Sequence, residues 1–160
     1  SDEAIILLSE ILSFSISKSE DGLVSIEQEL KQVENIIQLN QLRFDNKLHI
    51  QYEVVLTNPD IRVLPIILLT LVENIFKHGN MTNPESPALI RITHTDKSLQ
   101  IFTQNQVNPP FWPPVQSDGV QGNGMKNIRQ RLQKHDPEER FRFEYGLKDT
   151  NYQVLLEVPI

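Results

Sequence analysis

The sequence of 160 residues predicts an α+β protein, a two-layer sandwich in which helices cover one face of a mixed sheet. From Leu48 onward, the hydrophobic periods indicate strands and helices in the order β-α-β-β-loop-α-β-β. Strands that follow one another directly are typical of a mixed or antiparallel sheet with helices packed on one face. Residues 1–46 are predicted as a helical segment in front of this unit, and residues 47–160 as a domain of their own.

The composition excludes several classes of function. The chain has 21 acidic and 15 basic residues and a formal charge of −6, which leaves no basic face for a nucleic acid. It has no cysteine, so disulfides, thiol nucleophiles and cysteine-ligated zinc are excluded. The longest apolar run, Val63–Leu69 continuing to Val72, is too short to span a bilayer, and the acidic start lacks the basic residues of a signal peptide. Because the chain begins abruptly inside an apolar helical pattern, we expect it to be a fragment of a longer protein.

Two helices are predicted in the first 46 residues. Asp2–Ser17 places apolar side chains at helical spacing, and Ser19–Gly22 interrupts that pattern. Ser25 has the features of an N-cap, because Gln28 three residues later completes a capping box. The helix that Ser25 begins is predicted to run to about Phe44. The two helices indicate a helical hairpin or a coiled-coil-like stalk, and neither carries residues that suggest chemistry.

The strands and one further helix follow from the period of the pattern. Leu48–Leu56 alternates apolar and polar residues, as a strand with one buried face does, and Asn58–Asp60 is a turn signal. The later elements are a hairpin around Asp96 and Lys97, a helix and two closing strands. They are expected at Ala88–Thr95, Ser98–Gln104, Met125–Lys134, Phe141–Tyr145 and Tyr152–Val158.

A strongly apolar helix with one polar stripe is predicted at Pro65–Gly79. Proline suits the first turn of a helix and glycine suits its end. Apolar residues cover most of the circumference, so the helix should be largely buried. The polar residues recur at spacings of one side of a helix; they are Thr70, Glu73, Asn74, Lys77 and His78. An oxygen pair one turn before two possible cations would suit a hydrated magnesium ion and phosphates. A network of satisfied structural hydrogen bonds is an equal alternative.

Two further features could meet this stripe in space. Asn105 lies at the end of a predicted strand, and Gly122 and Gly124 come just before the predicted helix at Met125. Glycines ahead of a helix let a ligand approach free backbone N–H groups, and the helix dipole favours an anion there. A simple turn is the commoner explanation of two nearby glycines. The preceding segment, residues 106–121, is rich in proline and is expected to be either a functional lid or disordered.

The combination of two motifs resembles the ATP-binding domain of sensor histidine kinases. The segment Pro65–Gly79 reads PIILLTLVENIFKHG, which is similar to the N box of that family. The segment Gly122–Leu132 reads GNGMKNIRQRL, which is similar to its G2 box. The likeness is strongest to the LytS-type group, and it extends upstream to VSIEQELKQVENIIQLNQLRFDNKLHI, which resembles that group's segment between phosphoacceptor helices and ATP-binding domain. It covers essentially the whole chain.

This resemblance implies a Bergerat-type α/β sandwich that binds ATP with Mg²⁺ and phosphorylates a histidine. Asn74 would be the magnesium ligand, since an amide oxygen suits a hard cation shared with phosphates and water. Glu73 would be catalytic, orienting a water or polarising the attacking imidazole. Lys77 and His78 would approach the phosphates or the ribose. The remaining implied nucleotide contacts are Asn105, the amides around Gly122 and Gly124, Met125, Asn127 and Arg131. The proline-rich loop would be the ATP lid.

One departure concerns adenine. The wider superfamily binds adenine through an aspartate in a D-x-G-x-G motif, whereas the corresponding strand end here is Thr103–Gln106. Asn105 is therefore the candidate for this role. Its amide can accept a hydrogen bond from the adenine amino group, but without a charge, and the LytS-type group often has asparagine at this place.

A second departure concerns the substrate. The resemblance implies a histidine on a dimerising helix upstream, but His49, His78, His94 and His135 all lie elsewhere in the predicted elements. We therefore expect the phosphoacceptor to precede Ser1 and the isolated chain to be unable to label itself.

The resemblance also implies partners and a location. They are an upstream phosphoacceptor domain, a response regulator, a homodimer of the full-length protein, and the cytoplasmic side of a membrane-anchored bacterial protein. Two alternatives differ in function: a degenerate module that keeps the fold for protein contact, and a non-kinase ATPase of the same superfamily.

Overall fold

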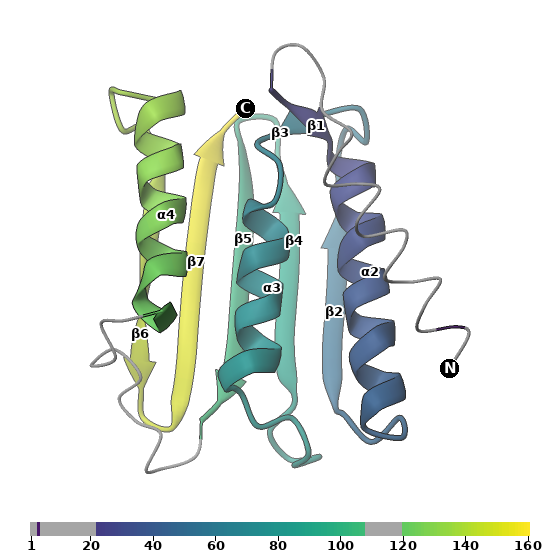
Figure 1. Ribbon diagram of the computed structural model, residues 1–160. Coiled ribbons are helices and arrows are strands. Elements are labelled where there is room, and N and C mark those ends of the chain that lie inside the picture. Colours follow the sequence, from purple (N-terminus) through teal and green to yellow (C-terminus); the bar gives the residue numbers. More distant parts are fainter. Residues whose placement is uncertain (1–2, 4–21, 108–119) are drawn as a thin grey trace.

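The structure, a computed structural model, describes Glu3, residues 22–107 and residues 120–160 (Figure 1). Almost all of the predicted helix at Asp2–Ser17, and most of the predicted lid, lie outside these residues. The described elements are, in chain order, β1 (Val24–Ser25), α2 (Ile26–Arg43), β2 (Ile50–Val55), β3 (Arg62–Val63), α3 (Ile67–His78), β4 (Ala88–His94), β5 (Ser98–Gln106), α4 (Val120–His135), β6 (Arg142–Lys148) and β7 (Asn151–Pro159).

The main sheet is mixed, as predicted. Its strand order is β2-β4-β5-β7-β6. The strands β2 and β4 pair in parallel, which requires the long connection that α3 provides. The other neighbours are antiparallel. The predicted hairpin joins β4 to β5, and the Thr95 N–H donates to the Ser98 carbonyl over 2.9 Å.

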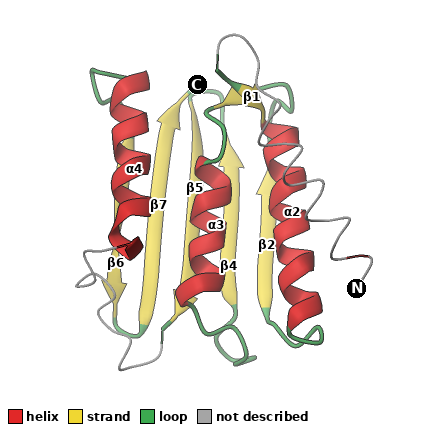
Figure 2. Ribbon diagram, viewed as in Figure 1, coloured by secondary structure: helices red, strands yellow, loops and turns green. Residues whose placement is uncertain are grey.

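The three described helices lie side by side on one face of this sheet, in the order α2, α3, α4 (Figure 2). The face of the sheet beneath them is apolar. Ile90 and Ile92 of β4 are fully buried, and Leu99 of β5 and Leu156 of β7 are each only 2% exposed. Burial of such a side chain contributes roughly 1.5–3 kcal/mol, so this layer contact is the main source of stability. The predicted two-layer α+β sandwich is therefore confirmed.

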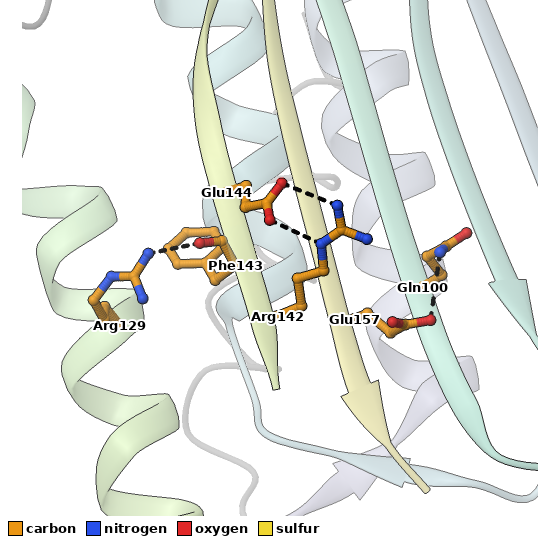
Figure 3. A network of polar contacts seen from close by, with 6 residues as sticks. All are labelled: Gln100, Arg129, Arg142, Phe143, Glu144 and Glu157. Atoms are coloured by element: carbon orange, nitrogen blue, oxygen red, sulfur yellow. Dashed lines mark hydrogen bonds and ion pairs between the residues drawn. The ribbon is translucent and has the colours of Figure 1, made fainter. Parts of the chain in front are cut away.

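The sheet also carries polar contacts on side chains that remain exposed or half-buried (Figure 3). On the edge strand β6, Arg142 Nε lies 2.8 Å from a carboxylate oxygen of Glu144. On the central strands, Gln100 Nε2 donates to Glu157 over 3.4 Å. From the helix layer, Arg129 of α4 reaches the same edge strand, where its Nη2 donates to the Phe143 carbonyl over 2.6 Å. Its guanidinium also lies 5.1 Å from the centre of the Phe143 ring. Arg129 therefore fastens α4 to the edge of the sheet.

The first described helix, α2, begins where the sequence predicts. The Gln28 N–H donates to the Ser25 side-chain oxygen over 3.1 Å, which caps the helix. Ile26 and Val33 are fully buried and belong to the same core as the sheet. The predicted division of the chain between residues 46 and 47 stays a prediction.

The helix α3 begins later than predicted and ends as predicted. Pro65 precedes the helix, and Ile66 occupies the N-cap with φ 74°. A β-branched residue at positive φ is strained, so the surrounding structure must hold it there. At the other end, the N–H of the C-cap Gly79 donates to the Ile75 carbonyl over 2.8 Å.

The short ladder between β1 and β3 was not predicted. It pairs Val24 with Val63 and Ser25 with Arg62. Two residues per strand are too few to show a period of two in the sequence. The ladder ties the start of α2 to the segment that leads into α3.

Candidate functional site

The polar stripe of α3 is present as predicted. Glu73 and Lys77 are exposed, while Thr70, Asn74 and His78 are half-buried. Six apolar residues of the same helix are buried on the remaining circumference. The stripe therefore forms the accessible side of an otherwise enclosed helix, and its half-buried members can face a ligand or another element.

The half-buried part of the stripe faces the start of α4. A β-carbon placed on Gly124 would lie 3.8 Å from the Thr70 methyl group and 3.9 Å from the Asn74 amide nitrogen. The next residue, Met125, is buried, and its sulfur lies 3.9 Å from the same nitrogen of Asn74. The two motifs, 51 residues apart at these positions, therefore meet in space, and Gly124 keeps room beside the Asn74 amide.

The glycines at the start of α4 are inside the helix, which corrects one expectation. The sequence placed Gly122 and Gly124 in a loop before a helix at Met125, but α4 begins at Val120. The first four N–H groups of an α-helix have no partner within it. Among the described residues of α4 these groups belong to residues 120–122, so Gly122 supplies one of them, whereas the i→i−4 pattern pairs the Gly124 N–H with the Val120 carbonyl. Gly124 contributes space rather than a free donor.

Asn105 lies against the C-terminal end of α3. It is 3% exposed at the end of β5, and its Nδ2 donates to the Gln106 carbonyl over 3.3 Å. A β-carbon on Gly79 would lie 2.7 Å from this nitrogen and 2.5 Å from the Ile75 carbonyl oxygen. No side chain fits there without movement, so Gly79 is required for the close approach of Asn105. The structure thus brings Asn105 to the same end of α3 as Lys77 and His78.

Helix directions add an electrostatic asymmetry. The helices α3 and α4 run in opposite directions, so the C-terminal end of α3 and the N-terminal end of α4 lie at the same end of the layer (Figure 1). Lys77 and His78 occupy the last turn of α3, where cations are favoured. Burial, and next the neighbouring Lys77 charge, lower the pKa of His78, which favours its neutral imidazole. The N-terminal end of α4 favours an anion.

Two other predicted contacts lie further along α4. Asn127 is exposed. Arg131 is half-buried, and burial lowers its pKa while the carboxylate of Glu29 acts in the opposite direction. Arg131 therefore lies within the electrostatic reach of α2. Its proposed nucleotide contact, like that of Asn127, stays a prediction.

Sequence reasoning missed Glu29, a fully buried acidic residue on α2. Both of its carboxylate oxygens accept from the Ile66 N–H, over 3.1 and 3.3 Å. Burial raises the pKa of Glu29 to about 7, against the opposing effects of the Ile66 N–H and of Arg131. A signal was available, because Glu29 falls three residues after Ile26 and four before Val33, on the apolar side of the predicted helix.

The residues around Asn74 fit a magnesium ion that is held mainly by phosphates and water. An asparagine oxygen is a suitable ligand, and Mg²⁺ commonly takes one or two protein ligands and keeps several waters. The room beside Gly124 would be filled in part by any larger side chain. Among the described residues, no group of three or more histidine, cysteine, aspartate or glutamate side chains could hold a metal.

A cavity of about 170 Å³ lies at the opposite end of the layer, between the start of α3 and the end of α4. Ile67, Leu132 and Phe141 are among its lining residues, and no described residue of the predicted site lines it. The candidate site on α3 therefore lies outside this cavity.

Within the described part of the chain, no helix is long and apolar enough to cross a bilayer.

The fold is that of the catalytic domains of histidine kinases. The catalytic domain of histidine kinase ThkA superposes with a TM-score of 0.59 over 86% of this chain and 95% of that domain, at 13% identity. The histidine kinase domain of the blue-light activated kinase EL346 from Erythrobacter litoralis gives a TM-score of 0.60 over 99% of this chain and 73% of that one, at 11% identity.

Sequence comparison adds particular relatives, the LytS sensor proteins. Sensor protein LytS of Staphylococcus epidermidis ATCC 12228 is 24% identical over 137 residues, which is 80% of this chain and 23% of that protein. LytS of Oceanobacillus iheyensis is 26% identical over 139 residues. The chain is thus homologous to these proteins over about four fifths of its length, and it spans about a quarter of theirs. No family model matches the chain.

Proposed function

We propose that this chain is the ATP-binding catalytic domain of a two-component sensor histidine kinase, which transfers the γ-phosphate of ATP to a histidine outside these 160 residues. The observation that carries the proposal is the meeting of Asn74 with Gly124 at the start of α4. Asn74 of α3 supplies an amide oxygen, and the first turn of α4 supplies free backbone N–H groups at the positive end of a helix. A metal-bound triphosphate matches both.

Each residue of the site has a role in this proposal. Asn74 binds the metal, and the N–H groups of the first turn of α4, including that of Gly122, bind phosphate oxygens. Lys77 and His78 approach the phosphates or the ribose from the end of α3, and Asn105 accepts from the adenine amino group. Glu73, exposed one position before Asn74, orients a water or polarises the attacking imidazole. When bound, Mg²⁺ neutralises phosphate charge, and transfer then rests mostly on positioning.

The remaining partners are proposed from the relatives. ThkA has been solved in complex with the response regulator protein TrrA, and we propose that a response regulator also accepts the phosphoryl group here. A homodimer, an upstream histidine domain and a place on the cytoplasmic side of a membrane-anchored protein belong to the same proposal.

Calorimetric titration with Mg·ADP tests the site. We expect the wild-type chain to bind and Asn74→Ala to lose about tenfold or more in affinity, because a charge-linked polar contact contributes roughly 1.5–3 kcal/mol. Asn58→Ala is the matched control, since that amide oxygen accepts from the Asp60 N–H in the turn before β3. It should bind as the wild type does. A wild-type chain that binds no nucleotide would contradict the function and favour a module that acts through protein contact. Unchanged affinity in Asn74→Ala would contradict the ligand assignment.

A further inference from the structure

Glu29 connects the three described helices at the end of the layer away from Asn105. It belongs to α2, it accepts from the Ile66 N–H at the start of α3, and the charge of Arg131 on α4 acts on it. Its side chain is fully buried. A buried carboxylate is costly unless it is hydrogen-bonded or paired, so its contacts must hold it in place.

The residue that Glu29 holds is strained. Ile66 has φ 74°, a conformation that isoleucine adopts only when its surroundings impose it. Without Glu29, the buried side of this turn would have a free N–H and no reason to keep that conformation. Glu29 therefore fixes the N-cap of α3 from a neighbouring helix, in place of the side chain of the cap residue, which makes no capping hydrogen bond.

The same N-cap residue is connected to the site. The Ile66 carbonyl accepts from the Thr70 N–H over 2.9 Å and from the Thr70 hydroxyl over 2.8 Å. A β-carbon placed on Gly124 would lie 3.8 Å from the Thr70 methyl group and 3.9 Å from the Asn74 amide nitrogen. Hydrogen bonds thus run from Glu29 through Ile66 to Thr70, and Thr70 borders the space beside Gly124 at the start of α4.

We propose that Glu29 is a positioning residue for the nucleotide site. Because it belongs to α2 and holds the start of α3, the position of α2 determines how α3 packs against α4. The inference rests on the proposed function, since it names a further determinant of the same site. A displacement of α2 would act on Ile66 first and then, through Thr70, on the space between Asn74 and Gly124.

Three variants separate this role from general stability. Glu29→Gln keeps an acceptor for the Ile66 N–H, and Glu29→Leu removes it. Asn40→Leu removes a buried amide of α2 whose Nδ2 donates to the Ile36 carbonyl of the same helix. Mg·ADP affinity is measured by calorimetry at neutral pH on chains that melt cooperatively. We expect Glu29→Leu to bind about tenfold more weakly, because the buried Ile66 N–H loses its hydrogen-bond acceptor. Glu29→Gln should restore most of the affinity, and Asn40→Leu should change it little.

Wild-type affinity in Glu29→Leu would overturn the inference, and so would an equal loss in Asn40→Leu. If Glu29→Leu does not fold, Glu29→Asp takes its place, because it keeps the charge but shortens the reach by one methylene. If the wild type binds no nucleotide, the proposed function fails. The inference is then tested by the amide exchange of Ile66 and the NMR shift of the Asn74 side-chain amide. Both should change in Glu29→Leu and not in Asn40→Leu, and no change would overturn it.

Discussion

At the scale of single residues, the site depends on where side chains are absent as much as on where they are present. Gly79 and Gly124 illustrate two different requirements. At Gly79, backbone and side-chain atoms leave no room for a β-carbon, whereas at Gly124 a β-carbon would make ordinary contacts. The first glycine is required by packing, and the second keeps space next to the Asn74 amide.

Gly79→Ala should destabilise the fold. The new methyl group would lie 2.5 Å from the Ile75 carbonyl oxygen, and overpacking of this kind costs roughly 1–3 kcal/mol. Urea denaturation measures the change in the free energy of unfolding. Gly146→Ala is the matched control, because its β-carbon would meet nothing within 4 Å, and its effect should stay within about 0.5 kcal/mol. Equal effects of the two substitutions would contradict the packing at Gly79.

Glu29 should make stability depend on pH. Its pKa is raised from 4.5 to about 7 in the folded protein, so the folded state binds a proton more tightly than the unfolded state. The stabilisation from this group is full below pH 4.5 and is lost as pH rises through 7. Urea melts at about pH 5 and about pH 8 should show a larger fall for the wild type than for Glu29→Gln, which does not titrate. Parallel pH curves for the two proteins would contradict the raised pKa.

At the scale of elements, α3 was predicted well because its two signals are strong. A wide apolar surface and a polar stripe at helical spacing are recognised wherever the two ends of the helix are placed. Both appear in the structure. Its first residue was misplaced, because the Ile66 N–H donates a long-range hydrogen bond to the Glu29 carboxylate, which holds Ile66 out of the helix. No local pattern around Pro65 contains that contact.

The start of α4 was misplaced for a related reason. Glycine has low helix propensity, so Gly122 and Gly124 were predicted to precede the helix. In the structure the helix includes them and begins at Val120. The proximity of Gly124 to Asn74 could be predicted only from the family resemblance, since spacing along the sequence does not fix which helices pack together.

Gly124→Ala should separate stability from binding. Alanine favours a helix over glycine by roughly 1 kcal/mol, and the added methyl group makes no close contact, so the melting temperature should stay the same or rise. The methyl group occupies space beside the Asn74 amide, so Mg·ADP affinity should fall. Thermal melts and calorimetry on the same samples measure both. A variant that is more stable and binds as well as the wild type would mean that this space is not used by the ligand.

At the scale of the whole molecule, the α+β fold class followed from the order of elements, which left either a mixed or an antiparallel sheet open. The strand order did not follow from it, because β7 lies between β5 and β6 and a sequence pattern does not specify which strands become neighbours. The layer arrangement nevertheless required helices on one face, but it did not specify that the polar stripe of α3 would face the glycines of α4.

The isolated chain should not phosphorylate itself. His94 is buried, and its Nδ1 lies 3.0 Å from the Thr57 hydroxyl and 3.3 Å from the Asn58 N–H, so it holds a turn. His78 belongs to the proposed site, and His49 and His135 are exposed outside it. Incubation with γ-labelled ATP and Mg²⁺, followed by acid-labile phosphate analysis, should give no labelled chain. Stable incorporation on any of these histidines would contradict the assignment of the acceptor to another part of the protein.

The antiparallel directions of α3 and α4 favour one orientation of a ligand bound between them. The carbonyl end of one helix and the amide end of the other stand next to each other (Figure 1), and they have opposite partial charges. The negative groups of a bound polyanion would be favoured at the N-terminal end of α4 and beside the Lys77 side chain, and disfavoured against the last carbonyls of α3. In the reversed orientation, the negative groups would face the last carbonyls of α3 and lose the N–H groups of α4. The directions of the two helices therefore favour one orientation of the bound molecule.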